Sequence, residues 1–436
     1  MNIRIYNARI LTMEEGRTLF EGELHVKGNR IAYVGPQLSE TETAWDREID
    51  AAGNVIMPGF KNAHTHSGMT FLRSFADDLP LLEWLEKQVF PMEEKITEED
   101  IYHLSKLAIM EYLTSGITAN FDMYLTPDSI ARASKDCGFR TVIVGAMNDF
   151  VQSPEALEQW LQTYNDPEEL VTFQLGFHAE YTNSKENLEK LAALVQKYQA
   201  PISAHSSESK SEVEGCMERY GMTPTKLFDS LGMLDYGGSY YHCIHMTEED
   251  MDLMAKKGIY AVTNPASNLK LASGIASIED MMAKGVKIAI GTDGPASNNC
   301  LDMFREMFLV TALAKIKSGN AAALSADKVL QMATVNGAHC MGLVDADVLA
   351  AGKFADLIMI DLHQPNMQPL NNIEKNIVYS GSKQNVKMTM VNGKILYEDG
   401  EFHIGTPAEE IYAKANEIKE AICNIVRTNT EMISPC

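Results

Sequence analysis

The sequence has few of the features that mark secreted or membrane proteins. Its seven cysteines are odd in number and scattered, and no Cys-x-x-Cys pair occurs, which favours reduced thiols over a disulfide framework. The first residues, Met1 to Asn7, lack the long apolar core of a signal peptide, and no apolar run reaches the length that spans a membrane. We therefore expect a cytoplasmic protein that does not insert into membranes.

Positive charge is also scarce. The 37 Lys and Arg residues face 60 Asp and Glu residues, which gives a formal net charge of −23. Nucleic acids and anionic membranes are bound mainly through Lys and Arg, so this balance argues against both partners. A hydrophobic share of 45% and a charged share of 22% are ordinary for a globular enzyme.

The two ends of the chain have a different pattern from its long middle. Residues 1–57 and 346–405 contain short β-rich runs that are broken by turn signals such as Asn392-Gly393. They predict a single β-sandwich domain that is built from both chain ends. Residues 406–436 carry an apolar stripe at helical spacing, which predicts a C-terminal helix that packs against the body of the protein.

The middle, residues 58–345, alternates apolar strand patterns with helical patterns. The eight expected strands are Val55–Met57, Ile117–Asp122, Arg140–Met147, Val171–His178, Pro201–His205, Tyr240–His245, Ile259–Asn264 and Val286–Thr292. Eight strand–helix units predict a (β/α)8 TIM barrel of the α/β class, whose active site lies at the carboxyl ends of the strands.

Side chains that bind metals lie at several of these strand ends. His64 and His66 follow the first expected strand, and the period-two alternation of a strand places both imidazoles on one face. His205 and Asp293 end two later strands. Either early histidine alone could be an ordinary loop residue, but the set has the few ligands that an open catalytic metal site needs.

Further polar residues in the same places can move protons. Glu208 follows His205 by three residues and can serve a metal-activated water, or it can be a carboxylate at a helix N-terminus. His242 and His245 lie on opposite faces of one strand, and we expect His242 to point inward. The fourth strand contains no Lys that could bridge two metals, which favours a single ion.

Several longer stretches extend this pattern over essentially the whole chain. They are Met57 to His66, Ala204 to Glu208, His242 to His245, Asn264 to Leu271, Gly291 to Asn299 and Ala333 to His339. In these stretches the sequence resembles the amidohydrolase superfamily, and within it the methylthioadenosine/S-adenosylhomocysteine deaminases. The resemblance implies one divalent ion per chain, Zn²⁺ with Fe²⁺ as the alternative, and a nucleoside as the small-molecule substrate.

The resemblance also implies roles for individual residues. The implied metal ligands are His64, His66, His205 and Asp293. The implied proton-transfer residues are Glu208, His242 and Asp293, and the implied substrate contacts are Trp84, Glu93, His178 and Glu208. Trp84 could equally be a packed helix residue and Glu93 a solvated loop charge.

The sequence departs from the family pattern at two places. No Arg follows the third strand, where the family's adenosylhomocysteine enzymes carry one, and Thr263 replaces a frequent His. We therefore expect a metal-dependent deaminase of an adenosine-type nucleoside, with its 5′ substituent, metal and any homo-oligomeric state left open. The alternatives are hydrolysis of another heterocycle, such as guanine, a pterin or a triazine, and a non-catalytic scaffold.

Overall fold

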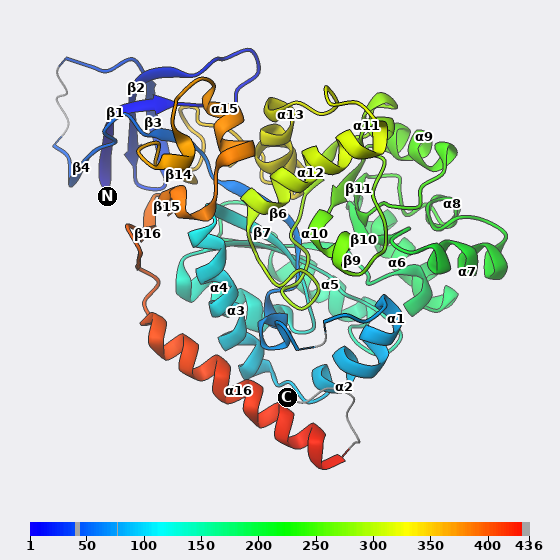
Figure 1. Cartoon of the computed structure of the whole chain (residues 1–436). Coiled ribbons are helices and arrows are strands. Elements are labelled where there is room, and N and C mark those ends of the chain that lie inside the picture. Colours follow the sequence, from blue (N-terminus) through cyan, green and yellow to red (C-terminus); the bar gives the residue numbers. More distant parts are fainter. Residues whose placement is uncertain (40–43, 76, 430–436) are drawn as a thin grey trace.

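The computed structural model describes residues 1–39, 44–75 and 77–429 (Figure 1). Its centre is an eight-stranded parallel sheet that curls into a nearly closed barrel with the strand order β13-β12-β11-β10-β9-β8-β7-β6. The strands are β6 (Phe60–Thr65), β7 (Ile117–Met123), β8 (Arg140–Val144), β9 (Val171–Gly176), β10 (Ile202–Ser206), β11 (Gly238–His242), β12 (Ile259–Thr263) and β13 (Ile288–Ile290). The predicted (β/α)8 barrel is confirmed.

Helices surround the barrel (Figure 1). The longer ones are α3 (Glu98–Thr114), α4 (Pro127–Cys137), α5 (Pro154–Thr163), α6 (Lys185–Tyr198), α7 (Lys210–Tyr220), α9 (Glu248–Lys257), α12 (Met303–Ser318) and α16 (Ala408–Asn429). The shorter ones are α1 (Leu81–Trp84), α2 (Phe90–Glu93), α8 (Pro224–Ser230), α10 (Pro265–Lys270), α11 (Ile278–Ala283), α13 (Ala326–Gln331), α14 (Gly337–Cys340) and α15 (Ile373–Lys375). A π-helical turn, η2 (Leu85–Val89), joins α1 to α2, so residues 81–93 form one helical segment. No helix in the described part of the chain is both long and apolar enough to cross a bilayer.

A second, nine-stranded sheet combines strands from both chain ends, as predicted. It contains β1 (Asn2–Ile10), β2 (Phe20–Lys27), β3 (Arg30–Gly35), β4 (Arg47–Asp50), β5 (Val55–Pro58), β14 (Leu357–Ile360), β15 (Val386–Val391), β16 (Lys394–Glu398) and β17 (Glu401–Phe402). Most neighbours are antiparallel, while β1 pairs in parallel with β4 and β5. A buried ion pair between Arg140 of β8 and Asp356 before β14, 2.6 Å long, ties this sheet to the barrel.

One predicted strand was assigned to the wrong sheet. The run Val55–Met57 lies in β5, which pairs with β1 and β14, and the first barrel strand is β6. An apolar run cannot reveal which sheet a strand joins. The true barrel strand reads Phe60-Lys-Asn-Ala-His-Thr65, and its polar residues hid it from a hydrophobic pattern although all six are buried.

The C-terminal helix follows the predicted stripe in part. Ile411, Ala415, Ile418 and Ile422 of α16 are buried, whereas Ile425 is exposed. Residues 430–436 of the predicted segment lie outside the described residues. The proposed domain limits stay predictions.

Side chains close the seam between the first and last barrel strands. Asn62 of β6 accepts from the backbone N–H of Thr292 at 2.8 Å and donates to the Thr292 hydroxyl at 2.7 Å. One step further along, the Asp293 N–H donates to the His64 carbonyl at 3.0 Å. The seam therefore brings His64 and Asp293 together.

Candidate active site

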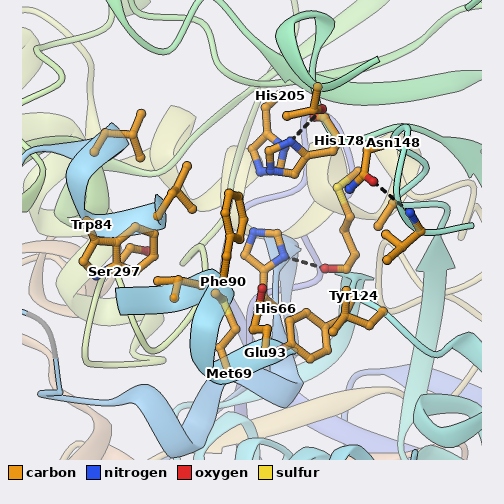
Figure 2. Close-up of a pocket in the computed structure, with 18 of the residues that line it drawn as sticks. His66, Met69, Trp84, Phe90, Glu93, Tyr124, Asn148, His178, His205 and Ser297 are labelled. Atoms are coloured by element: carbon orange, nitrogen blue, oxygen red, sulfur yellow. Dashed lines mark hydrogen bonds between the residues drawn. The ribbon is translucent and has the colours of Figure 1, made fainter. Parts of the chain in front are cut away.

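A cavity of about 660 Å³ opens at the carboxyl ends of the barrel strands. The predicted residues that line it are His66, Trp84, Glu93, His178, His205, Glu208, His242 and Asp293. His64 lies beside it and is completely buried. Figure 2 shows the imidazoles of His66, His178 and His205 facing one another, with Trp84 to one side and Asn148 to the other.

Potential metal ligands converge at the base of this cavity. Asp293 Oδ1 lies 3.1 Å from His66 Nε2 and 3.5 Å from His64 Nε2. Ligand atoms of His64, His205 and His242 also lie within 4.8 Å of one another. Such separations suit ligands that each bind a shared ion at about 2.0–2.2 Å.

Hydrogen bonds aim two of these rings. His66 Nδ1 contacts the Met123 carbonyl, and His205 Nδ1 contacts the His178 carbonyl at 2.7 Å. Because a carbonyl oxygen only accepts, each Nδ1 carries a proton, and each Nε2 is the nitrogen that can offer a lone pair to an ion. This arrangement is the usual support of a metal-binding histidine.

The surroundings of His64 test whether this donor set fits a metal ion. Neither of its ring nitrogens has a hydrogen-bond partner although the residue is completely buried, and an unpaired buried polar group is costly. Burial lowers the pKa of His64 to about 3, so the ring is neutral, as a ligand must be. The ring stacks on Tyr241 with centroids 3.7 Å apart. The donor set of imidazoles and one carboxylate therefore fits Zn²⁺ or Fe²⁺.

The Asp293 side chain is held by three hydrogen bonds, and its backbone has an unusual conformation. Its φ of 61° lies in the left-handed region, and strain of this kind persists where surrounding contacts impose it. Oδ2 accepts from Ser267 Oγ at 2.5 Å and Ser297 Oγ at 2.9 Å, and Oδ1 accepts from the Gly294 N–H at 2.7 Å. Gly291 is needed before it, because a Cβ there would lie 2.8 Å from that of His64.

Glu208 lies in the cavity wall before α7 begins. Ser209 caps that helix by accepting from the Glu212 N–H, so Glu208 is not the capping residue. Its Oε2 lies 3.7 Å from His242 Nε2, and burial raises its pKa. A carboxyl group with a raised pKa can donate a proton near neutral pH.

His242 and His245 point to different surroundings. His242 is buried in the cavity wall, and its Nδ1 lies 2.7 Å from Asn268 Oδ1. His245 does not line the cavity, and its Nε2 contacts the Ser273 carbonyl at 2.9 Å. Thr263 ends β12, where its carbonyl accepts from the Gly291 N–H at 3.0 Å.

The helical segment 81–93 also lines the cavity. Trp84 both packs in the core and lines the cavity. Glu93 lies in α2 rather than in a loop, and burial raises its pKa to about 7 although Tyr124 acts against this shift. His178 Nδ1 lies 3.1 Å from the Thr182 hydroxyl, and burial lowers the His178 pKa to about 4, which leaves a neutral ring.

The wall after β8 carries no positive charge. Asn148 and Phe150 line the cavity there, and among the described residues no Lys or Arg lines it. Asn148 Oδ1 accepts from the N–H groups of Phe150 at 2.8 Å and Val151 at 2.9 Å. Its amide nitrogen is therefore the group left for a ligand.

Several supporting residues were not predicted from the sequence. They are Glu212, Ser267, Asn268, Ser297 and Glu306, together with Tyr124 after β7. Ser267, Asn268 and Ser297 stand in the stretches after β12 and β13 that carry the family resemblance, which is the signal that could have found them. Glu212, Glu306 and Tyr124 lie outside those stretches.

Comparison with known proteins agrees with this geometry. Residues 55–396 match the amidohydrolase family. The chain belongs to the amidohydrolase family. The resemblance inferred from the sequence is thus confirmed.

Individual relatives cover nearly the full chain. A protein of Moorella thermoacetica named 5-methylthioadenosine/S-adenosylhomocysteine deaminase is 40% identical over 413 residues, which is 92% of this chain and 95% of the relative. The structure of an adenosine deaminase from Xanthomonas campestris with bound zinc has a TM-score of 0.89 and 31% identity, covering 96% of this chain and 98% of that one.

A third relative shares the fold alone. An atrazine chlorohydrolase from Arthrobacter aurescens complexed with zinc has a TM-score of 0.88 at 22% identity, covering 96% of this chain and 100% of that one. Proteins with differently named activities thus share one architecture, and the substrate has to be inferred from the pocket.

Proposed function

We propose that this amidohydrolase is a hydrolytic deaminase that replaces the 6-amino group of an adenosine-type nucleoside with oxygen and releases ammonia. The observation that carries the proposal is that Glu208, His242 and Asp293 line the same cavity as Trp84 and Glu93. The first group suits chemistry on the purine ring, and the second suits recognition of a ribose. The names of the relatives from Moorella and Xanthomonas support the same reaction.

The metal ion would be held by His64, His66, His205 and Asp293. A bound Zn²⁺, or Fe²⁺ as the alternative, makes water acidic enough to ionise near neutral pH. Asp293 would accept the water proton on Oδ2 and then give it to the departing amino group, which leaves as ammonia. The Ser267 and Ser297 hydroxyls that now donate to Oδ2 can rotate and accept from it, because a hydroxyl both donates and accepts.

Two other residues would act on the purine. Glu208 would donate its proton to ring N1, which makes C6 more electrophilic, and its raised pKa suits this role. His242 would donate from Nε2 to the attacking oxygen. Because its Nδ1 donates to Asn268, it can do so only as an imidazolium.

Glu93 would accept hydrogen bonds from the 2′- and 3′-hydroxyls, beside the apolar wall of Trp84. A site built around such bonds discriminates strongly, because a substrate without hydroxyls leaves a buried carboxylate unpaired. This pair favours a nucleoside over a free base such as guanine or a triazine.

The outer cavity favours an uncharged 5′ substituent. The lining there is made of the apolar Leu85, Val89, Phe90 and Phe150 together with the acidic Glu86 and Glu94, and Asn148 offers only a neutral donor. A homocysteine carboxylate would lose water without gaining a cation. Methylthio, hydroxyl or hydrogen at this position avoids that loss.

Ammonia release from a panel of substrates tests the proposal. The panel contains adenosine, methylthioadenosine, 5′-deoxyadenosine, S-adenosylhomocysteine, adenine and guanine. We expect kcat/KM to be highest for the nucleosides with uncharged 5′ groups. Faster release from guanine or adenine would show that the pocket serves a free base.

A further inference from the structure

A buried carboxylate outside the cavity has no role in the chemistry described so far. Glu306 lies in the first turn of α12, and its exposed fraction is 0%. No ion pair joins it to a Lys or Arg of the described residues. Burial raises its pKa, while the Ala266 N–H and the Asn298 amide act against this shift because they donate to the ionised form. A buried carboxylate without a cation is costly and calls for specific partners.

The two oxygens of Glu306 accept from two different segments. Oε2 accepts from the backbone N–H of Ala266 in α10 at 3.0 Å, and Oε1 accepts from Asn298 Nδ2, beyond β13, at 2.8 Å. The same Asn298 amide also donates to the Thr292 carbonyl at 2.5 Å. One side chain thus bridges α10 and the loop that follows β13.

Both segments contact or adjoin the proposed catalytic residues Asp293 and His242. In α10, Ser267 donates to Asp293 Oδ2, and Asn268 accepts from His242 Nδ1. In the loop, Thr292 directly precedes Asp293, whose left-handed φ of 61° requires outside support. The bridge made by Glu306 is therefore one residue away from each segment's contact with the site.

We propose that Glu306 is a positioning residue that fixes Asp293 relative to His242. Its partners are both N–H donors, so the position requires an acceptor at each oxygen. A glutamine would keep one acceptor and turn an NH₂ group toward the other donor. The inference rests on the proposed deaminase function only for its kinetic test, because the contacts themselves can be probed without substrate.

The first experiment compares Glu306→Gln with the wild type. We expect kcat for the best nucleoside of the panel to fall about 10- to 100-fold, the range seen when residues behind metal ligands are replaced. KM should change little, because Glu306 does not line the cavity. A kcat within twofold of the wild type would overturn the proposal.

A second readout does not depend on turnover. With Co²⁺ in the site, the visible absorption of the ion reports its ligands, so a displaced Asp293 should change the spectrum and speed metal loss to a chelator. An unchanged spectrum and release rate would contradict the proposal, whatever substrate the enzyme prefers. If the wild type deaminates no nucleoside, the proposed function fails while this comparison still tests Glu306.

Two further variants separate positioning from general damage to α12. Asp302→Ala removes the N-cap of the same helix, whose Oδ1 accepts from the Phe304 N–H at 3.0 Å, and should lower Tm without lowering kcat. Asn298→Ala should reproduce the kcat loss, and the double variant with Glu306→Gln should lose no more than the larger single loss. Equal kcat losses in Asp302→Ala, or losses that multiply in the double variant, would show a merely structural role.

Discussion

Glu212 Oε2 accepts the backbone N–H of Glu208 at 2.9 Å, so one buried glutamate holds another in the cavity wall. Its second oxygen accepts from the Ser207 N–H at 2.8 Å, and Ser207 has a left-handed φ of 55°. These two hydrogen bonds fix the backbone where the chain leaves β10, and the Glu208 side chain remains free to transfer a proton.

Replacing Glu208 by Gln should remove most turnover and leave the metal bound. The substitution removes a proton donor and not a ligand, so kcat should fall about 10²- to 10⁴-fold. Metal content and kcat are the measurements. Glu214→Gln, on the exposed side of α7, is the matched control and should behave as the wild type. A near-normal rate for Glu208→Gln with metal bound would assign Glu208 another function.

Metal analysis of the purified protein should give about one divalent ion per chain, as expected for a single open catalytic site. Removal by a chelator should abolish ammonia release and lower Tm, because a ligand that binds only the folded state stabilises it. Restoring Zn²⁺ and Fe²⁺ separately shows which ion supports the reaction. Two equivalents, or full activity in metal-free protein, would contradict the assigned ligand set.

The ribose contact predicts a large difference between nucleosides and analogues without hydroxyls. Adenosine should react far better than adenine or 2′,3′-dideoxyadenosine, and Glu93→Ala should narrow that gap by raising KM for adenosine. Comparison of kcat/KM across the three compounds checks both points. Equal rates on adenine and adenosine in the wild type would remove Glu93 from the substrate site.

The same residue predicts a pH dependence of substrate binding. Burial raises the pKa of Glu93 to about 7, so the carboxylate is ionised above that pH and protonated below it. Only the ionised form accepts fully from both hydroxyls, so KM for adenosine should rise as pH falls through about 7. In Glu93→Gln, which does not titrate, KM should lose this dependence; a KM profile unchanged from the wild type would assign the titration to another group.

The wall after β8 predicts that kcat/KM for adenosylhomocysteine should not exceed kcat/KM for methylthioadenosine. Asn148→Arg should raise kcat/KM for adenosylhomocysteine relative to methylthioadenosine by about tenfold or more, because a charge-assisted hydrogen bond contributes roughly 1.5–3 kcal/mol. Asn148→Leu controls for the loss of the turn that Asn148 makes with Phe150 and Val151. A wild type that strongly prefers adenosylhomocysteine would mean that a cation outside the described lining reaches its carboxylate.

The sequence predicted the barrel and the residues that gather at one of its ends, and it did so for a physical reason. Parallel strands end at one face, so histidines and acids that follow strands must meet there, as His66, His205 and Asp293 do. The same reasoning failed for β6, whose inward side chains are polar because they serve the site and the seam.

The supporting contacts could not be predicted in this way. Glu306 lies 40 residues from Ala266 in the sequence, and Asn268 lies 26 residues from His242. Each contact depends on how a helix sits against a strand end, which no periodicity encodes. The family-like stretches contain Ala266, Asn268 and His242 but not Glu306, and the pairing of donors and acceptors became evident only in three dimensions.

The seam at Asn62 and Thr292 has a consequence for how the protein matures. These partners are 230 residues apart in the sequence, and the proposed ligands His64 and Asp293 lie one or two residues beyond them. Contacts of such long range form late, because the intervening chain must first be ordered. During synthesis, His64 and His66 are therefore present long before Asp293, the carboxylate that completes the proposed ligand set. During refolding, metal binding should accordingly follow the assembly of the other strands and coincide with closure of the barrel.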